Sequence, residues 1–133
     1  RLSIDNTPRD LDLINMKTIA EKVFEPLRKF VGGPIAINSF YRSPKLNSAI
    51  GGSTSSQHCK GCALDIDDTY GYKTNAEMFE YIKCNLDYDQ MIWEFGNDKN
   101  PDWVHISYIT EGVNRRRCLL AYKENKKTKY KVI

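Results

Sequence analysis

Apolar residues recur at helical spacing near the start of the chain. Between residues 16 and 31 they come every three or four positions, which predicts one helix with a single buried face. Thr7-Pro8 would begin it, with threonine as the cap and proline at the first helical position. Gly32-Gly33-Pro34 would end it. The apolar positions are Met16, Ile19, Ala20, Val23, Leu27, Phe30 and Val31.

Two more helices are predicted from their start signals. Ser43-Pro44 has the pattern of a cap followed by a first-turn proline, and begins a short helix that runs to about Ala49. Thr74-Asn75-Ala76-Glu77 has the capping-box pattern and begins a longer helix. The inner face of this longer helix would carry Phe79, Ile82 and Leu86.

Short segments rich in β-branched and aromatic residues predict strands, most of them late in the chain. Alternation along residues 62–67 places Asp65 and Asp67 on one face and Ile66 on the other. Helices early and strands late predict an α+β domain with a mainly antiparallel sheet packed against helices. We expect a single domain over residues 1–133. The predicted strands are 35–40, 62–67, 90–95, 103–108, 117–122 and 129–133.

Composition and charge exclude some classes of protein. The chain is 41% apolar and 28% charged, as in ordinary globular proteins, and no apolar run would span a membrane. A net charge of +3 is too small to argue for nucleic acid, and we expect a monomer. Basic residues gather at 115–117 and 123–131. A solvated hairpin face explains that cluster, and binding to an anionic polymer such as a cell wall is the alternative.

Four cysteines occur, at Cys59, Cys62, Cys84 and Cys118. The spacing of Cys59 and Cys62 is that of redox pairs and zinc knuckles. A knuckle needs a second such pair, and a redox pair belongs at a helix N-terminus, whereas this pair leads into a predicted strand. Structural or incidental cysteines are therefore the favoured interpretation.

The chain has only two histidines, His58 and His105, and each lies near acidic residues. His58 and Asp65 are seven positions apart across Gly61, where a positive φ would let the chain reverse so that both side chains approach one ion. A lone histidine is more often structural. Here Asp65 would complete a trio of ligands for zinc, which in enzymes usually takes three protein ligands and leaves a fourth position open. Asp102 would be free for proton transfer.

The motif Ser56-x-His58-x-x-Gly61-x-Ala63-x-Asp65, followed by Asp102-x-x-His105, resembles the zinc D-alanyl-D-alanine carboxypeptidases. That family includes phage endolysin peptidases and shares its fold with the hedgehog signalling domain. The segment 39–47 looks like the family's arginine segment, with Arg42 in it. Gly51-Gly52-Ser53 and Asn114-Arg115-Arg116 fit as well, so the resemblance covers roughly residues 7–120.

The resemblance implies a role for each of these residues. His58, Asp65 and His105 would bind Zn²⁺. Asp102 would act as general base and later protonate the leaving amine, and Arg42 would stabilise the oxyanion or hold the substrate. Glu94, at the end of a predicted strand, is the rival base, and would otherwise bind substrate or support a ligand histidine. Ser56 and Gln57 would line the substrate pocket.

The implied function is zinc-dependent hydrolysis of peptide bonds in bacterial peptidoglycan, by a carboxypeptidase or an endolysin-type endopeptidase. The chain would act on the bacterial cell wall. The chain begins at Arg1 and no signal peptide is visible, which leaves its compartment open, and its small size favours a lysin-like, phage-type enzyme. A zinc-stabilised binding module of the hedgehog type is the alternative, and a redox protein built on Cys59 and Cys62 is a third.

Overall fold

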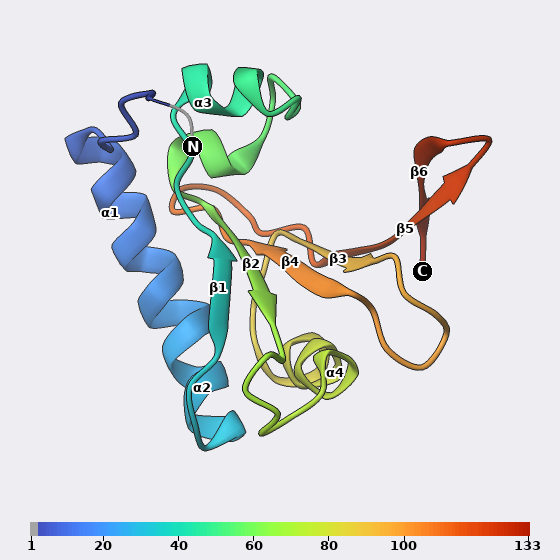
Figure 1. Ribbon diagram of the computed structural model, residues 1–133. Helices are drawn as coiled ribbons and strands as arrows, with labels where there is room; N and C mark the ends of the chain where they lie inside the picture. The colour runs from blue at the N-terminus through green and yellow to red at the C-terminus, as the bar shows by residue number, and fades with distance from the viewer. Residues whose placement is uncertain (1–2) are drawn as a thin grey trace.

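A six-stranded sheet forms the centre of the molecule (Figure 1). The computed structural model describes residues 3–133. Neighbouring strands follow the order β1-β2-β4-β3-β5-β6 and are antiparallel, except that β3 and β5 run parallel. The predicted α+β class with a mainly antiparallel sheet is confirmed. The strands are β1 (Ala36–Ser39), β2 (Ala63–Asp67), β3 (Gln90–Glu94), β4 (Trp103–Ser107), β5 (Arg117–Glu124) and β6 (Lys127–Val132).

The first helix is continuous but changes its winding in the middle. A π-helical turn, η1, separates two α-helical parts. Pro26 lies two residues after the end of this turn, and because proline has no N–H to donate, the regular hydrogen-bond ladder is interrupted there. The helical segments of the chain are α1 (Asp10–Ile19), η1 (Ala20–Phe24), α2 (Glu25–Val31), α3 (Pro44–Ala49), the 3₁₀ turn η2 (Gln57–Lys60) and α4 (Asn75–Asn85).

The predicted start of the first helix is wrong by a few residues. Thr7 is not the cap, because its backbone N–H and hydroxyl both donate to the Asp5 carboxylate. The cap is Arg9, whose backbone N–H donates to the Asp12 side chain at 3.0 Å. The Arg9 guanidinium also pairs with Asp12. This bond, together with the positive charge of Arg9, lowers the pKa of the Asp12 carboxyl.

The other predicted helix ends are confirmed. Gly32 takes the left-handed conformation at the end of α2, with φ of 79°. The Ser43 hydroxyl accepts from the Leu46 N–H at the start of α3. Thr74 and Glu77 form the expected capping box of α4. These signals lie within a few residues of one another, so the sequence alone is sufficient to locate them.

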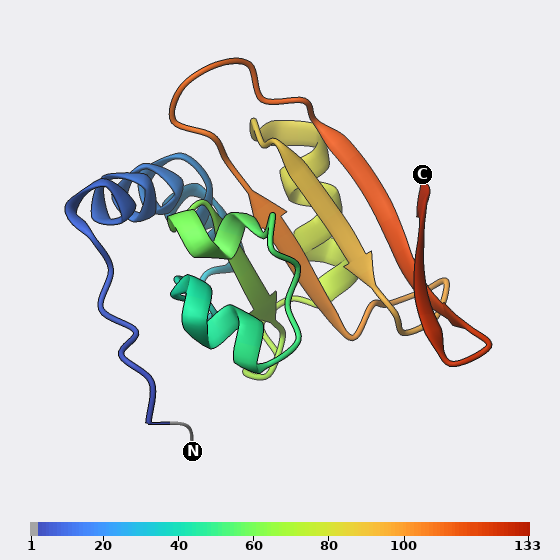
Figure 2. The same ribbon diagram turned by 90° about the horizontal axis from the view of Figure 1, so that it is seen from above.

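One face of the sheet is covered by α1, α2 and α4, which lie on the same side of it in Figure 2. Helix residues at the predicted spacing meet alternate residues of β2, β3 and β4, and the core forms between them. Leu86, expected on the inner face of α4, follows the end of that helix and is only partly buried. The fully buried members of this core include Ile19, Val23, Leu27, Leu64, Ile66, Met91, Val104 and Ile106.

The opposite face of the sheet is polar near its centre and is partly covered by α3 and η2 (Figure 2). Strand register brings the polar residues together, because Asp65 lies opposite His105 between β2 and β4. His105 in turn lies opposite Ile92 of β3, and Glu94 is two residues further along β3 on the same face. This face is where the predicted site residues gather.

The hairpin of β5 and β6 extends from the far end of the sheet (Figure 1). Alternation along β6 puts Lys127, Lys129 and Lys131 on one face, and Thr128 and Tyr130 on the other. Lys129 pairs with Glu124 at 2.9 Å. Within residues 3–133, no helix is long and apolar enough to cross a membrane.

Candidate metal centre

Three side chains converge on the polar face of the sheet: His58, Asp65 and His105. Their ligand atoms all lie within 4.8 Å of one another. His105 Nδ1 is 3.0 Å from one Asp65 oxygen, and His58 Nε2 is 3.3 Å from the other. The ligand atoms of a tetrahedral zinc ion, each roughly 2.1 Å from the metal, lie about 3.4 Å apart. The two contacts with Asp65 are close to this spacing, so the three predicted ligands could hold a metal ion.

The three residues come from two strands and one turn. Asp65 and His105 are direct partners across β2 and β4, so the sheet itself fixes their separation. His58 lies in η2, which Gly61 ends with φ of +73°, as the sequence predicted. A Cβ on Gly61 would lie 2.6 Å from the Asp12 carbonyl oxygen. Only glycine therefore lets this turn pack against α1 and return to β2.

The imidazole of His58 is held in one orientation. Its Nδ1 lies 2.7 Å from the Phe40 carbonyl oxygen, and the ring is almost fully buried. Its Nε2 has no hydrogen-bond partner in the described chain, although it lies near Asp65. Metal-binding histidines commonly donate one ring N–H to a carbonyl and present the other nitrogen to the metal. A buried, unpartnered Nε2 beside a carboxylate fits that arrangement.

Asp65 is ionised in this setting. Burial by itself raises the pKa of Asp65, but the bond from His105 and the close contacts with both imidazoles outweigh it and hold that pKa well below its usual value. Metal ligands must be deprotonated to bind. An anionic oxygen between two imidazoles is a ligand set typical of a catalytic zinc ion.

Glu94 is the acid that shares this cavity. Its side chain is buried, with 8% of its surface exposed, and it lines the same cleft as His58 and His105. Burial, with a smaller contribution from the Asp65 charge, raises the pKa of Glu94 to about 7. No hydrogen bond or ion pair of its carboxylate is found within residues 3–133. A carboxyl with a pKa near neutrality can both accept and return a proton.

Asp102, expected to act beside the metal ligands, lies at an exposed bend just before β4. It lines a hollow with Trp93 and Asn97 that adjoins the cleft, because Phe95 and Lys123 line both. Its backbone is fixed by a bond to Glu94 and another to Asn75. Alternation along β4 does not determine where the Asp102 side chain faces, because Asp102 precedes the strand. The choice between Asp102 and Glu94 as the base stays a prediction.

Arg42 and Ser56 lie at the rim of the cleft, as expected. The Arg42 backbone N–H donates to the His58 carbonyl, and its guanidinium lies 3.4 Å from the Ser56 hydroxyl. Ser56 also caps the His58 N–H. Among the described residues Arg42 pairs with no carboxylate, and its buried Nε has no partner. The cation is therefore free to meet an anionic group of a ligand.

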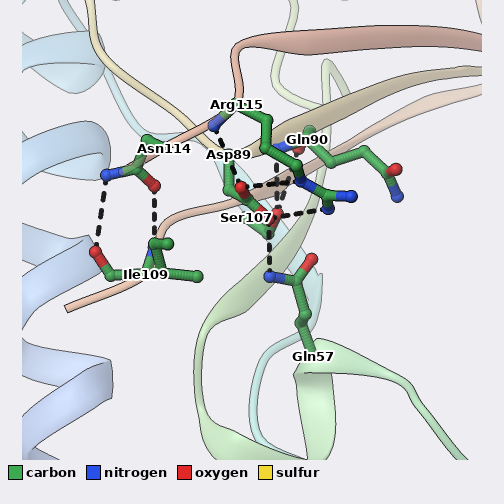
Figure 3. Close-up of polar contacts among 7 residues, drawn as sticks. All are labelled: Gln57, Asp89, Gln90, Ser107, Ile109, Asn114 and Arg115. Atoms are coloured by element: carbon green, nitrogen blue, oxygen red, sulfur yellow. Dashed lines mark hydrogen bonds and ion pairs between the residues drawn. The ribbon is translucent and has the colours of Figure 1, made fainter. Parts of the chain in front are cut away.

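Gln57 lines the cleft with its neighbours, but its side-chain amide is already engaged. Its Nε2 donates to the carboxylate of Asp89 at 3.0 Å (Figure 3). Sequence reasoning did not single out Asp89, because it lies 32 positions from Gln57 and no local pattern links the two. Its partner Arg115 belongs to the Asn114-Arg115-Arg116 motif, which was the one available signal.

The C-terminal hairpin supplies one wall of the cleft, which has a volume of about 610 Å³. Lys123, Thr128 and Tyr130 line it from β5 and β6. Burial and the nearby Glu94 charge raise the pKa of Tyr130. No local pattern in the sequence links Tyr130 to the site. Of the aromatic residues near the motifs, Trp103 lines this cleft, whereas Trp93 and Tyr108 pack against the core.

The cysteines do not join the metal-ligand group. All four are free, and neither Cys59 nor Cys62 belongs to the cluster formed in residues 3–133. Cys62 is buried, and burial raises the pKa of its thiol, which disfavours the reactive thiolate.

The model of the Peptidase M15 family matches residues 3–107. The chain belongs to this family. M15 peptidases are zinc-dependent metallopeptidases, and in this M15 peptidase the His58, Asp65 and His105 group has the composition and spacing to hold a metal ion. The match ends with β4, so the β5–β6 hairpin that walls the cleft lies beyond it. No curated protein matches the chain.

Proposed function

We propose that this M15 peptidase hydrolyses peptide bonds of bacterial peptidoglycan, as a monomer, with zinc held by His58, Asp65 and His105. When bound, zinc lowers the pKa of a coordinated water to roughly 7 and polarises a carbonyl oxygen. The alternative that we set against it is a zinc-stabilised binding module that cuts no bond.

The presence of Glu94 in the same cleft is the observation that favours an enzyme. A binding module gains nothing from a buried carboxyl that pairs with no cation and pays a desolvation cost when ionised. A hydrolase needs such a group near its attacking water. The pKa of about 7 suits that work at neutral pH.

Each residue then has a chemical task. Glu94 accepts a proton from the attacking water and delivers it to the leaving amine. Arg42, which carries its charge at any pH of interest, stabilises the oxyanion that develops on the scissile carbonyl. Ser56 supports Arg42 through the contact at 3.4 Å. Asp102, at the bend before β4, is the rival candidate for this proton transfer.

The test is digestion of purified muropeptides of defined structure by the protein, with products identified by mass spectrometry. We expect cleavage that a chelator abolishes and that added zinc restores. The mass of the products also identifies the scissile bond, and whether the enzyme trims an end or cuts within the peptide. Zinc binding without cleavage of any muropeptide would support the binding module instead.

Two matched variants test the choice of base. Glu94→Gln should keep zinc binding and lose roughly 10²- to 10⁴-fold in turnover, the range for general acid–base catalysis. Asp102→Asn removes the same charge from the adjoining hollow and, if Glu94 is the base, should keep both properties. The reverse result would return the base role to Asp102.

A further inference from the structure

Asp89 is a buried carboxylate outside the metal centre, with 3% of its surface exposed (Figure 3). Four donors satisfy it. Three come from Arg115, whose backbone N–H, Nε and Nη2 lie 3.1, 3.0 and 2.8 Å from its oxygens. The fourth is the Gln57 amide at 3.0 Å. Burial raises the pKa of Asp89, but the bonds from Arg115 and Gln57 outweigh it and lower that pKa.

The loop that carries Arg115 is fixed on both sides. Asn114 closes it by accepting from the Ile109 N–H at 2.8 Å (Figure 3). Arg116 donates to the Leu86 and Lys83 carbonyls at the end of α4. Asn114 and Arg116 therefore anchor the loop, and of the three side chains in this motif only that of Arg115 bonds to the Asp89 carboxylate.

The Asp89 carboxylate connects this loop to the turn that carries His58. Gln57 is the first residue of η2 and His58 the second. The backbone of Asp89 bonds to the Ser107 carbonyl at 2.8 Å, two residues after His105 in β4. The next residue, Gln90, accepts from and donates to Ser107 as well. Asp89 thus touches the segments that carry both histidines.

A 3₁₀ turn of four residues has poor hydrogen-bond geometry and holds its shape weakly without outside support. Bonds from Ser56 and Arg42 support η2 on the side of the cleft. The bond between Gln57 and Asp89 supports it independently of these contacts. The anchor is stiff, because Asp89 is itself held by the planar fork of Arg115.

We propose that Gln57, Asp89 and Arg115 form a positioning chain that fixes the His58 turn, and that this chain sets the affinity and geometry of the metal centre. Gln57 is then a positioning residue and not a contact for substrate. The inference rests on the proposed metal site, but concerns residues that touch neither metal nor reacting atoms.

The test measures metal binding and not hydrolysis. Zinc affinity is measured by competition with a chromophoric chelator, and the site geometry by the visible absorption of the Co²⁺-loaded protein. Gln57→Ala should weaken zinc binding about 10-fold, the lower end for groups that support metal ligands. Gln57→Glu, which sets a second carboxylate against Asp89, should weaken it further. Both variants should alter the Co²⁺ spectrum, because the spectrum reports the geometry of the site. A variant that only loses stability would keep the wild-type spectrum in its folded molecules.

Asn114→Ala is the matched control, because it loosens the same loop without breaking the link between Asp89 and Gln57. It should lower the melting temperature yet keep wild-type zinc affinity and the wild-type Co²⁺ spectrum. A double-mutant cycle tests whether Gln57 and Asp89 act through the same bond. If they do, Gln57→Ala and Asp89→Asn combined should weaken zinc binding by much less than the product of their separate factors.

Wild-type zinc affinity and Co²⁺ spectrum in Gln57→Ala would overturn the inference, as would an equal effect of Asn114→Ala. Either result would leave the proposed peptidase intact. Failure of the wild-type protein to bind zinc at all would instead overturn the proposed function. The two failures are therefore distinguishable.

Discussion

Ile66 and Asp65 are neighbours in β2, yet they belong to two differently built faces of the sheet. Ile66 enters the core under α1, α2 and α4, where contacts are apolar and non-directional. Asp65 enters the metal centre, where its two oxygens lie 3.0 Å from His105 Nδ1 and 3.3 Å from His58 Nε2. The core side tolerates small changes of shape, whereas the metal side depends on donors and charges placed within tenths of an ångström.

Stability and function are therefore separated between the two faces of the sheet. Apolar burial on the helix side stabilises the fold, while the polar side holds buried charged groups that are costly to keep without a ligand. Substitutions at adjacent positions should therefore affect different quantities: metal affinity on the polar face, and the free energy of unfolding on the apolar face.

Asp65→Asn should have the largest effect, and on metal binding. The substitution keeps the shape of the side chain but removes the anionic ligand, so we expect zinc affinity to fall more than about 100-fold, beyond the range for supporting groups. Hydrolysis should disappear with it. Chelator competition measures the affinity, and circular dichroism should show that the fold is retained. Wild-type affinity would exclude Asp65 as a ligand.

Ile66→Ala, one position along, should have the opposite profile. Ile66 is fully buried, and truncation of such a side chain costs about 3 kcal/mol in the free energy of unfolding. Denaturant unfolding measures that loss. Below the unfolding transition, zinc affinity should stay within about twofold of wild type, because the change faces away from the ligands. A large drop in affinity would show that the two faces are coupled.

Glu94→Gln should change stability by an amount that depends on pH and vanishes in acid. Burial raises the pKa of Glu94 to about 7 in the folded protein, from 4.5. The folded state therefore holds this proton more tightly than the unfolded state, and stability is lost as pH rises from about 4.5 through 7. Relative to wild type, the metal-free variant should gain at most about 3 kcal/mol at pH 8 and almost nothing at pH 4.

Thermal unfolding of metal-free protein across this pH range checks the prediction. Asp102→Asn is the control, because that carboxylate is solvent-exposed and its removal should give no comparable gain. An equal gain for Glu94→Gln at pH 4 and pH 8 would mean that packing, and not the buried charge, is responsible.

Local signals were sufficient for much of the fold. The capping box at Thr74, the stop at Gly32 and the alternation around Asp65 each depend on residues within a turn or a strand, and each was predicted. The start of the first helix was missed because Asp5 competes for Thr7, while Asp12 reaches back to cap the helix at Arg9. Two equally local capping schemes were available, and the structure uses the one at Arg9.

The metal ligands were found from the sequence because histidine is scarce and the spacing is distinctive. The surroundings of the site were less accessible. Whether Asp102 or Glu94 faces the ligands depends on strand register and on the bend before β4, which the spacing of residues does not determine. The bond between Gln57 and Asp89 and the position of Tyr130 depend on contacts between distant segments.

The outermost strand, β6, has a consequence for the behaviour of the protein at high concentration. All six of its residues are exposed, and an unprotected edge of this kind can pair with the same strand of another molecule and extend the sheet. Lys127, Lys129 and Lys131 recur at every second position, so two such strands brought edge to edge would set like charges beside one another. The lysines thus oppose pairing between the edge strands of two molecules. Thr128 and Tyr130, on the other face of β6, line the cleft.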